Sequence, residues 1–192
     1  MIDTNLEVAY LVGLLIASII RKYFLKGMTQ KEKMEAIKGP DGPLMILVAI
    51  PMFILPLLYI FTQRLDFANY ELPLGIAWLG APTFAIALWL LWRSHSDLGK
   101  NFSLTTDTKE EQTLVTTGVY KKIRHPMYTA HSIWGIAQAL LLQNWIAGPT
   151  FFLASIPLYI RRIPREEEMM MKEFGDDYKE YMEKTGRLLP KL

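Results

Sequence analysis

Charge-free apolar blocks alternate with charged connections along most of this chain. Residues 43–61 and residues 72–92 each contain no Asp, Glu, Lys or Arg. Each block has about 20 residues, the helix length that crosses a hydrocarbon core of roughly 30 Å. We therefore predict one membrane-spanning helix in each block.

A longer charge-free run covers residues 126–160 and exceeds the length of a single crossing. Its middle, residues 144–149, reads NWIAGP, and a Gly-Pro pair of this kind ends one helix and starts another. We predict a tight helical hairpin whose second arm runs through Ile163. The N-terminal block, residues 8–20, is shorter, and it spans only if the charged residues at its ends reach the interfaces.

Basic residues are concentrated in alternate connections. Residues 21–42 carry six Lys or Arg and residues 93–125 are basic again, whereas residues 62–71 carry only Arg64. Cytoplasmic connections of membrane proteins contain an excess of Lys and Arg. The alternation therefore predicts five spans, with the N-terminus outside and the C-terminus in the cytoplasm.

These patterns predict an all-α, polytopic membrane protein with a cytoplasmic cofactor pocket. Residues 1–192 form a single integral membrane domain. Within it, residues 1–92 supply three spans, and residues 93–192 form the catalytic region. That region consists of a cytoplasmic loop, the helical hairpin and a C-terminal amphipathic helix.

The composition excludes several kinds of site. The 192 residues include no Cys, which excludes disulfides, thiolate metal ligands and a cysteine nucleophile. The three His stand at no spacing typical of a metal site, and no GxG motif for a dinucleotide or phosphate loop occurs. The net charge of +2 follows from the topological bias, so we expect neither a metal nor a nucleic-acid partner.

The stretch RHPMY, residues 124–128, stands where a charged loop meets the hairpin. Pro126 suits the first turn of a helix, which places His125 at the N-terminal cap. The free N–H groups and positive dipole end of that helix would face the cytoplasm and can hold a carboxylate. Alternatively, His125 and Tyr128 are interfacial anchors of a spanning helix.

The second charged stretch, RRIPREEE at residues 161–168, follows the last span. If the helix continues through Pro164, Arg162 and Glu166 share one face. Alternatively, these are topological basic residues followed by a solvated acidic turn. Further along, apolar residues at helical spacing predict an amphipathic helix that lies on the membrane or covers the first stretch, namely Met170, Phe174, Tyr178 and Tyr181.

In order along the chain stand LVTTGVYKKIRHPMY, the hairpin, the Arg- and Glu-rich residues 161–167, FGDDYKEY and a closing GRLLP. As an ordered set these motifs resemble the isoprenylcysteine carboxyl methyltransferase family, over roughly residues 101–190. RHPxY alone is less specific, because membrane sterol reductases and phospholipid methyltransferases carry similar stretches. The first two spans show no motif to match.

The resemblance implies an integral membrane enzyme that transfers a methyl group from S-adenosylmethionine to the α-carboxylate of a lipid-modified cysteine. It implies catalytic roles for Arg162, which would hold the substrate carboxylate, and for Glu166. Pro164 and Arg165 precede the acidic run here, so a register slip of one or two residues stays open. The implied cofactor-binding residues are Gln112, Thr113, Leu114, Val115, Tyr120, His125, Pro126, Met127, Tyr128, Glu166 and Glu167.

The chemistry suits a site at the membrane boundary. Methyl transfer from a sulfonium to a carboxylate cancels opposite charges, so a site drier than water strengthens the electrostatics once both charges are held. No general base is needed, because a carboxylate is ionised at neutral pH. We expect His125 to bind rather than to transfer protons. A prenyl tail would lie between spans, where Gly75, Gly80 and Pro82 of the third span leave room for close approach or a kink. Alternatively, the glycines simply pack against other helices.

Other functions remain open at this point. One is reduction of a sterol or steroid with NADPH, and another is methylation of a phospholipid amine. A non-enzymatic transporter or subunit is the third, and it would place polar groups such as Gln138 and His131 within the membrane. The methyl acceptor, the membrane (cell membrane or endoplasmic reticulum) and the oligomeric state are not determined by the sequence.

Overall fold

The computed structural model describes residues 4–102 and 113–191, which are helical and contain no β-strand apart from two isolated bridges. The predicted all-α class is therefore confirmed for this part of the chain. Its helices are α1 (Thr4–Leu25), α2 (Gln30–Lys38), α3 (Gly42–Ala49), η1 (Ile50–Ile54), α4 (Leu55–Phe61), η2 (Asp66–Ala68), α5 (Leu74–Trp78), α6 (Gly80–Leu98), η3 (Gly99–Asn101), η4 (Gly118–Lys121), α7 (Pro126–Leu142) and α8 (Thr150–Lys184).

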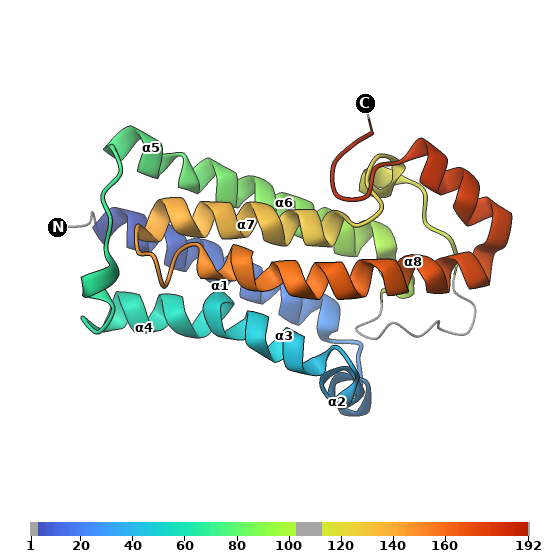
Figure 1. The fold of residues 1–192 in the computed structure, drawn as a ribbon, viewed down its shortest axis with the longest axis horizontal. Coiled ribbons are helices and arrows are strands. Elements are labelled where there is room, and N and C mark those ends of the chain that lie inside the picture. The colour runs from blue at the N-terminus through green and yellow to red at the C-terminus, as the bar shows by residue number, and fades with distance from the viewer. Residues whose placement is uncertain (1–3, 103–112, 192) are drawn as a thin grey trace.

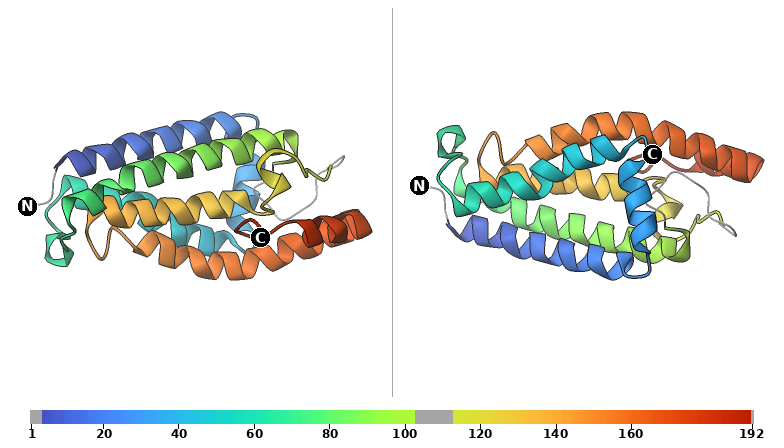
Figure 2. Two further views of the ribbon diagram at one scale, coloured as in Figure 1. Left: turned by 90° about the horizontal axis from the view of Figure 1, so that it is seen from above. Right: turned by 90° about the horizontal axis from the view of Figure 1, so that it is seen from below.

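The long helices lie side by side along the long axis of the molecule (Figures 1 and 2). In the described part, three segments are long and apolar enough to cross a membrane: Thr4–Leu25, Gly42–Phe61 and Leu74–Leu98. They coincide with the three predicted N-terminal spans, although the third runs past Trp92 to Leu98. That α7 and the first part of α8 also cross, and that the N-terminus lies outside, remain predictions.

Large apolar side chains cover the outward faces of these helices. Val12, Leu15 and Ile19 of α1 and Ile46 and Ile54 of the second segment are all exposed. Soluble monomeric proteins rarely expose contiguous apolar surface of this kind. The exposed faces are accordingly suited to contact lipid tails.

The predicted break between residues 144 and 149 is present. The helix α7 ends at Leu142, and Gln143 takes a left-handed conformation with φ 46°. The Asn144 side chain accepts hydrogen bonds from the backbone N–H groups of Ile146 and Ala147 at 3.0 and 2.9 Å, which closes the turn. The next helix begins at Thr150, directly after the Gly-Pro pair.

Gln138 of α7 is buried in the bundle and forms hydrogen bonds with three other segments. Its Oε1 accepts a hydrogen bond from the Tyr10 hydroxyl at 2.8 Å, and its Nε2 donates to the carbonyls of Pro51 and Ala147 at 2.8 and 2.6 Å. The Pro51 carbonyl is available because, in the π-helical turn η1, the Leu55 N–H bonds instead to Ile50. Gln138 therefore joins α1, η1 and α7. These hydrogen bonds account for a polar side chain inside the bundle, so no transported solute is needed to explain it.

The helix α8 is longer than predicted. The second arm of the hairpin is predicted to run through Ile163, and continuation through Pro164 is left open by the sequence. The helix α8 does continue, through Pro157 and Pro164 to Lys184, with one kink at Gly175, where φ is 52°. Figure 1 shows the part after the kink folding back toward η4. There, the Tyr181 hydroxyl donates to the Tyr120 carbonyl at 2.7 Å, so this segment covers the first charged stretch.

Gly80 provides a test of the helix packing. A Cβ atom at this position would lie 2.6 Å from Leu141 Cγ, whereas a Cβ at Gly75 would meet nothing within 4 Å. Gly80 thus serves close packing of α6 on α7 rather than an opening for a lipid tail. We expect Gly80→Ala to cost about 1–3 kcal/mol of stability, as overpacking does. The melting temperature in detergent should fall for Gly80→Ala and stay unchanged for Gly75→Ala, and equal values would contradict the packing interpretation.

Candidate active site

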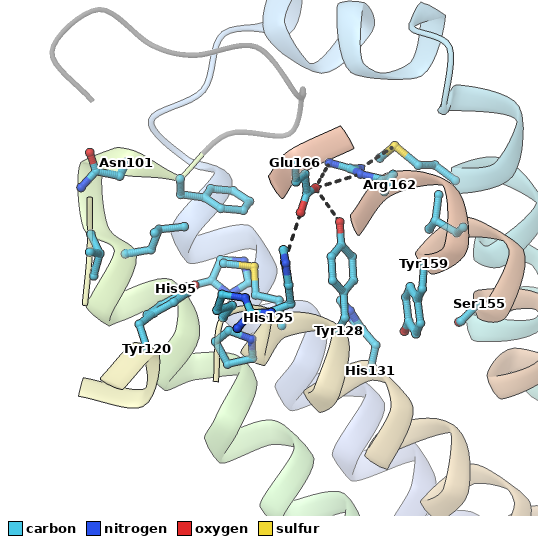
Figure 3. A pocket seen from close by; sticks show the side chains of 18 of the residues that line it. His95, Asn101, Tyr120, His125, Tyr128, His131, Ser155, Tyr159, Arg162 and Glu166 are labelled. Atoms are coloured by element: carbon cyan, nitrogen blue, oxygen red, sulfur yellow. Dashed lines mark hydrogen bonds and ion pairs between the residues drawn. The ribbon is translucent and has the colours of Figure 1, made fainter. Parts of the chain in front are cut away.

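A cavity of about 310 Å³ lies between the C-terminal ends of α1, α3 and α6, the start of α7 and one side of α8 (Figure 3). It brings together two charged stretches that lie about forty residues apart in the chain, at His125 and at Glu166. Gln112 lies outside the described residues, and Glu167 does not line the cavity. The predicted site residues that do line it are Thr113, Leu114, Val115, Tyr120, His125, Pro126, Met127, Tyr128, Arg162 and Glu166.

Glu166 is the polar centre of the cavity. Its Oε1 accepts hydrogen bonds from the Tyr128 hydroxyl at 2.6 Å and from Arg162 Nε at 3.1 Å. The Arg162 Nη2 lies 3.0 Å from the same oxygen, so the pair expected from the four-residue spacing is formed. The sequence left the register of the Arg- and Glu-rich stretch open by one or two residues. In the structure, Arg162 and Glu166 face the cavity, whereas Arg165 bonds to Asp41 and Glu168 bonds to Lys172.

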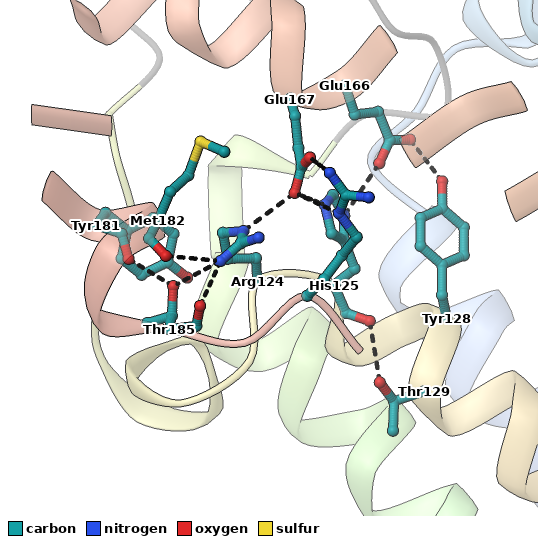
Figure 4. Close-up of polar contacts among 10 residues, drawn as sticks. Arg124, His125, Tyr128, Thr129, Glu166, Glu167, Tyr181, Met182 and Thr185 are labelled. Carbon is teal, nitrogen blue, oxygen red and sulfur yellow. Dashed lines mark hydrogen bonds and ion pairs between the residues drawn. The ribbon is translucent and has the colours of Figure 1, made fainter. Parts of the chain in front are cut away.

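Glu167 belongs to a buried network beside the cavity (Figure 4). Its carboxylate accepts hydrogen bonds from Arg124 Nε at 3.0 Å and Arg187 Nε at 3.1 Å, and lies 3.4 Å from His125 Nε2. The Arg124 and Glu167 side chains are only 8% and 6% exposed. The structure therefore places Glu167, which the resemblance implied as a cofactor ligand, among protein donors.

The C-terminal segment 186–188 holds the start of α7 in place. The Arg124 and His125 N–H groups donate to the carbonyls of Gly186 and Arg187 at 2.9 and 3.0 Å. One turn on, the Thr129 hydroxyl donates to the Leu188 carbonyl at 2.6 Å. The N–H groups just before α7 are thus bonded to the chain's own backbone, and the side chains of His125 and Tyr128 contact the carboxylates of Glu166 and Glu167. That the N-terminus of α7 holds a carboxylate remains a prediction.

Arg124 and Arg187 were not identified as site residues from the sequence. Besides Glu167, the Arg124 guanidinium donates to the Met182 carbonyl at 3.1 Å and to the Thr185 carbonyl. Only their positions in the sequence could have identified them as site residues. Arg124 directly precedes His125, and Arg187 lies in the closing GRLLP motif. Positive-inside topology explained both residues equally well.

The segment before α7 is fixed by the end of α6. The Asp97 carboxylate accepts a hydrogen bond from Val119 N–H at 2.9 Å, next to Gly118, whose φ of 60° suits glycine. A Cβ at Gly118 would also collide with that carboxylate, at 2.1 Å from Oδ2. With Gly118 in place, Tyr120 points inward and its hydroxyl donates to the Ser94 carbonyl at 3.2 Å.

Both ring nitrogens of His125 face carboxylates, with Nδ1 3.5 Å from Glu166 Oε2 and Nε2 3.4 Å from Glu167 Oε1. Burial alone would lower the pKa of His125, but the two carboxylates outweigh it and raise the pKa above the ordinary 6.5. Burial likewise opposes a charge on Glu167, yet donors from His125, Arg187 and Arg124 lower the pKa of Glu167 to about 2. The site therefore favours an imidazolium between two carboxylates.

This arrangement makes stability depend on pH. Because the pKa of His125 is raised, its contribution is fully present below about pH 6.5 and is lost as the pH rises through the raised value. The contribution of Glu167, with its lowered pKa, is lost only as the pH falls below 4.5 toward about 2. We expect the melting temperature in detergent to fall above about pH 6.5, and His125→Asn to flatten that slope. An unchanged slope in this variant would assign the effect to another group.

Comparison with known proteins shows that about half of this chain is similar to one family. Residues 78–172 match the model of the isoprenylcysteine carboxyl methyltransferase (ICMT) family. The protein-S-isoprenylcysteine O-methyltransferase of Schizosaccharomyces pombe is 33% identical over 94 residues, which cover 48% of this chain and 40% of that protein. The enzyme of the same name from Xenopus laevis is 36% identical over 94 residues, covering 48% of this chain and 33% of the relative.

A solved structure of the eukaryotic intramembrane Ras methyltransferase ICMT has a similar fold. The TM-score is 0.62 with 21% identity, over 89% of this chain and 60% of that chain. The matched region spans less than half the length of the two curated relatives. Residues 78–172 are thus similar to the isoprenylcysteine carboxyl methyltransferase family, which agrees with the resemblance drawn from the motifs up to residue 172.

Proposed function

We propose that this protein transfers a methyl group from S-adenosylmethionine to the carboxylate of a prenylated or otherwise lipidated cysteine. The observation that carries the proposal is the convergence of residues 113–128 and of Arg162 and Glu166 on one cavity. The cavity lies at the end of the bundle where the basic connections gather. We place that end at the cytoplasmic face of a cell or endoplasmic reticulum membrane.

The lining contains charged and aromatic groups that can bind an S-adenosyl cofactor. When bound, S-adenosylmethionine supplies an electrophilic methyl group on a sulfonium. The Glu166 carboxylate can pair with the cofactor's amino group or ribose hydroxyls, and the faces of Tyr120 and Tyr128 can lie near its positive charge. A volume of about 310 Å³ is at the lower end of the range for small-molecule sites.

Arg162 is the residue that we expect to align the acceptor. Its guanidinium can present parallel N–H donors to a carboxylate, which fixes the orientation of the attacking oxygen. When bound, the cofactor would supply the methyl group to that oxygen, and because a carboxylate is ionised at neutral pH, no residue would need to accept a proton. The cavity is also lined by Met52, Phe53, Phe151 and Leu158, which suit an apolar tail.

A methyl-transfer assay in detergent or bilayers tests the proposal. The acceptors are farnesylated cysteine, the same compound without the prenyl group, and a phospholipid amine. We expect methyl ester only from the farnesylated cysteine, together with binding of S-adenosylhomocysteine and none of NADPH. Methylation of the amine alone, or binding of NADPH in place of S-adenosylhomocysteine, would contradict the proposal.

A further inference from the structure

Arg21 of α1 lines the same cavity, although α1 lies outside the residues that match the family model. Arg21 directly follows the first apolar block, residues 8–20, and is one of the charged residues at its ends that must reach the interface if the block spans. Its neighbours Lys22 and Tyr23 are indeed exposed. Arg21 is instead partly buried, and it lines the cavity with Leu25 of the same helix.

Arg21 differs from the other two cavity arginines in its partners. Arg162 is bonded to Glu166, and Arg124 is bonded to Glu167 and to backbone carbonyls. Among the described residues, no carboxylate forms an ion pair with Arg21. A guanidinium withdrawn from bulk water loses hydration, and buried charges of this kind are normally paired.

Within the described part of the chain, the polar groups next to Arg21 that line the cavity supply no negative charge. The charge of Arg21 reaches two titratable residues of the lining, His95 of α6 and His131 of α7 (Figure 3). The Nδ1 of His95 is bonded to the Leu91 carbonyl at 2.9 Å. The Nε2 of His131 is buried and has no hydrogen-bond partner among the described residues. This side of the cavity presents a cation and an unused imidazole nitrogen.

We propose that Arg21 is an anion-binding residue that holds a carboxylate inside this cavity. A carboxylate matches the guanidinium fork in charge and geometry. The proposal rests on the proposed function for the identity of that carboxylate, because methyl transfer brings two of them into the cavity: that of the cofactor's amino acid and that of the acceptor. Arg162 and Arg21 then provide one guanidinium for each.

The test compares ligands with and without a carboxylate. S-adenosylhomocysteine is paired with 5′-methylthioadenosine, which lacks the amino acid, and N-acetyl-S-farnesylcysteine is paired with its methyl ester. Affinity is measured by calorimetry or thermal shift in wild type, Arg21→Ala and Arg21→Met. Lys22→Ala is the matched control, because it removes an exposed charge at the next position of the same helix.

We expect the Arg21 variants to bind one of the two acids about 10- to 100-fold more weakly while the partner lacking that carboxylate binds unchanged. Loss on S-adenosylhomocysteine identifies the cofactor carboxylate, and loss on farnesylcysteine identifies that of the acceptor. The proposal is overturned if both acids bind the Arg21 variants as tightly as they bind the Lys22 control. It is also overturned if the wild-type protein binds each acid no more tightly than the partner that lacks the carboxylate.

These outcomes are separate from failure of the proposed function. An absence of methyl ester with wild type, combined with Arg21-dependent preference for an acid over its uncharged partner, would refute methyl transfer and retain the anion site. If Arg21→Ala does not fold, Arg21→Met keeps an unbranched apolar side chain in place of the arginine stem and removes the charge and the donors.

Discussion

Replacing Arg162 by alanine should lower the rate of methyl transfer by about 100-fold or more while the affinity for S-adenosylhomocysteine changes little. The reason is that Glu166 keeps other partners when Arg162 is removed. The Tyr128 hydroxyl still donates to Glu166 at 2.6 Å, and His125 Nδ1 still lies 3.5 Å away. The carboxylate that we expect to contact the cofactor therefore stays in place, while the acceptor loses its guanidinium.

Glu166→Ala should have the reverse effect and weaken S-adenosylhomocysteine binding by about 10- to 100-fold. Arg162→Lys keeps the charge but not the fork, so it should retain only part of the activity. Arg165→Ala is the matched control, because Arg165 lies on the same helix but bonds to Asp41 outside the cavity. Equal loss of binding and of turnover in both Arg162→Ala and Glu166→Ala would show that these roles are assigned wrongly.

Replacing Glu167 by alanine should strongly destabilise the protein, because it removes the centre of a buried charge network. The change would leave Arg124, which is 8% exposed, without its carboxylate. Removing one partner of a buried ion pair costs about 3–5 kcal/mol. For a chain of this size, that corresponds to a fall of roughly 6–20 °C in melting temperature.

The measurement is thermal unfolding in detergent at neutral pH, with Glu168→Ala as the matched control. Glu168 is the next residue of α8, is exposed, and bonds to Lys172 on the surface, so its loss should change the melting temperature little. Glu167→Gln keeps the shape of the side chain and should fall between the two. If Glu167→Ala has the same melting temperature as Glu168→Ala, the network does not stabilise the fold.

The membrane-type helices could be predicted from the sequence because lipid contact requires long charge-free blocks, and these are visible without any tertiary information. The course of α8 could not. Pro164 favours a helix boundary locally, yet the chain continues as one helix to Gly175. Beyond that kink the side chains of Tyr178 and Tyr181 become buried against the segment around Tyr120, a contact across about sixty residues.

The polar site was predictable only in part, for a similar reason. The pair of Arg162 and Glu166 follows from helical spacing, which is a local property. The partners of Arg124 lie 43 to 61 residues away along the chain, so no spacing rule indicates them. Arg21 is a further case, since topology alone explains a basic residue at the end of a first span.

A crystal structure of the protein with S-adenosylhomocysteine bound is the most direct test of the proposed site. We expect the ligand to lie in the cavity between residues 113–128 and the α8 segment of Arg162 and Glu166, in contact with the Glu166 carboxylate. A ligand bound elsewhere, or His125 and Glu166 on separate surfaces with no cavity between them, would contradict it.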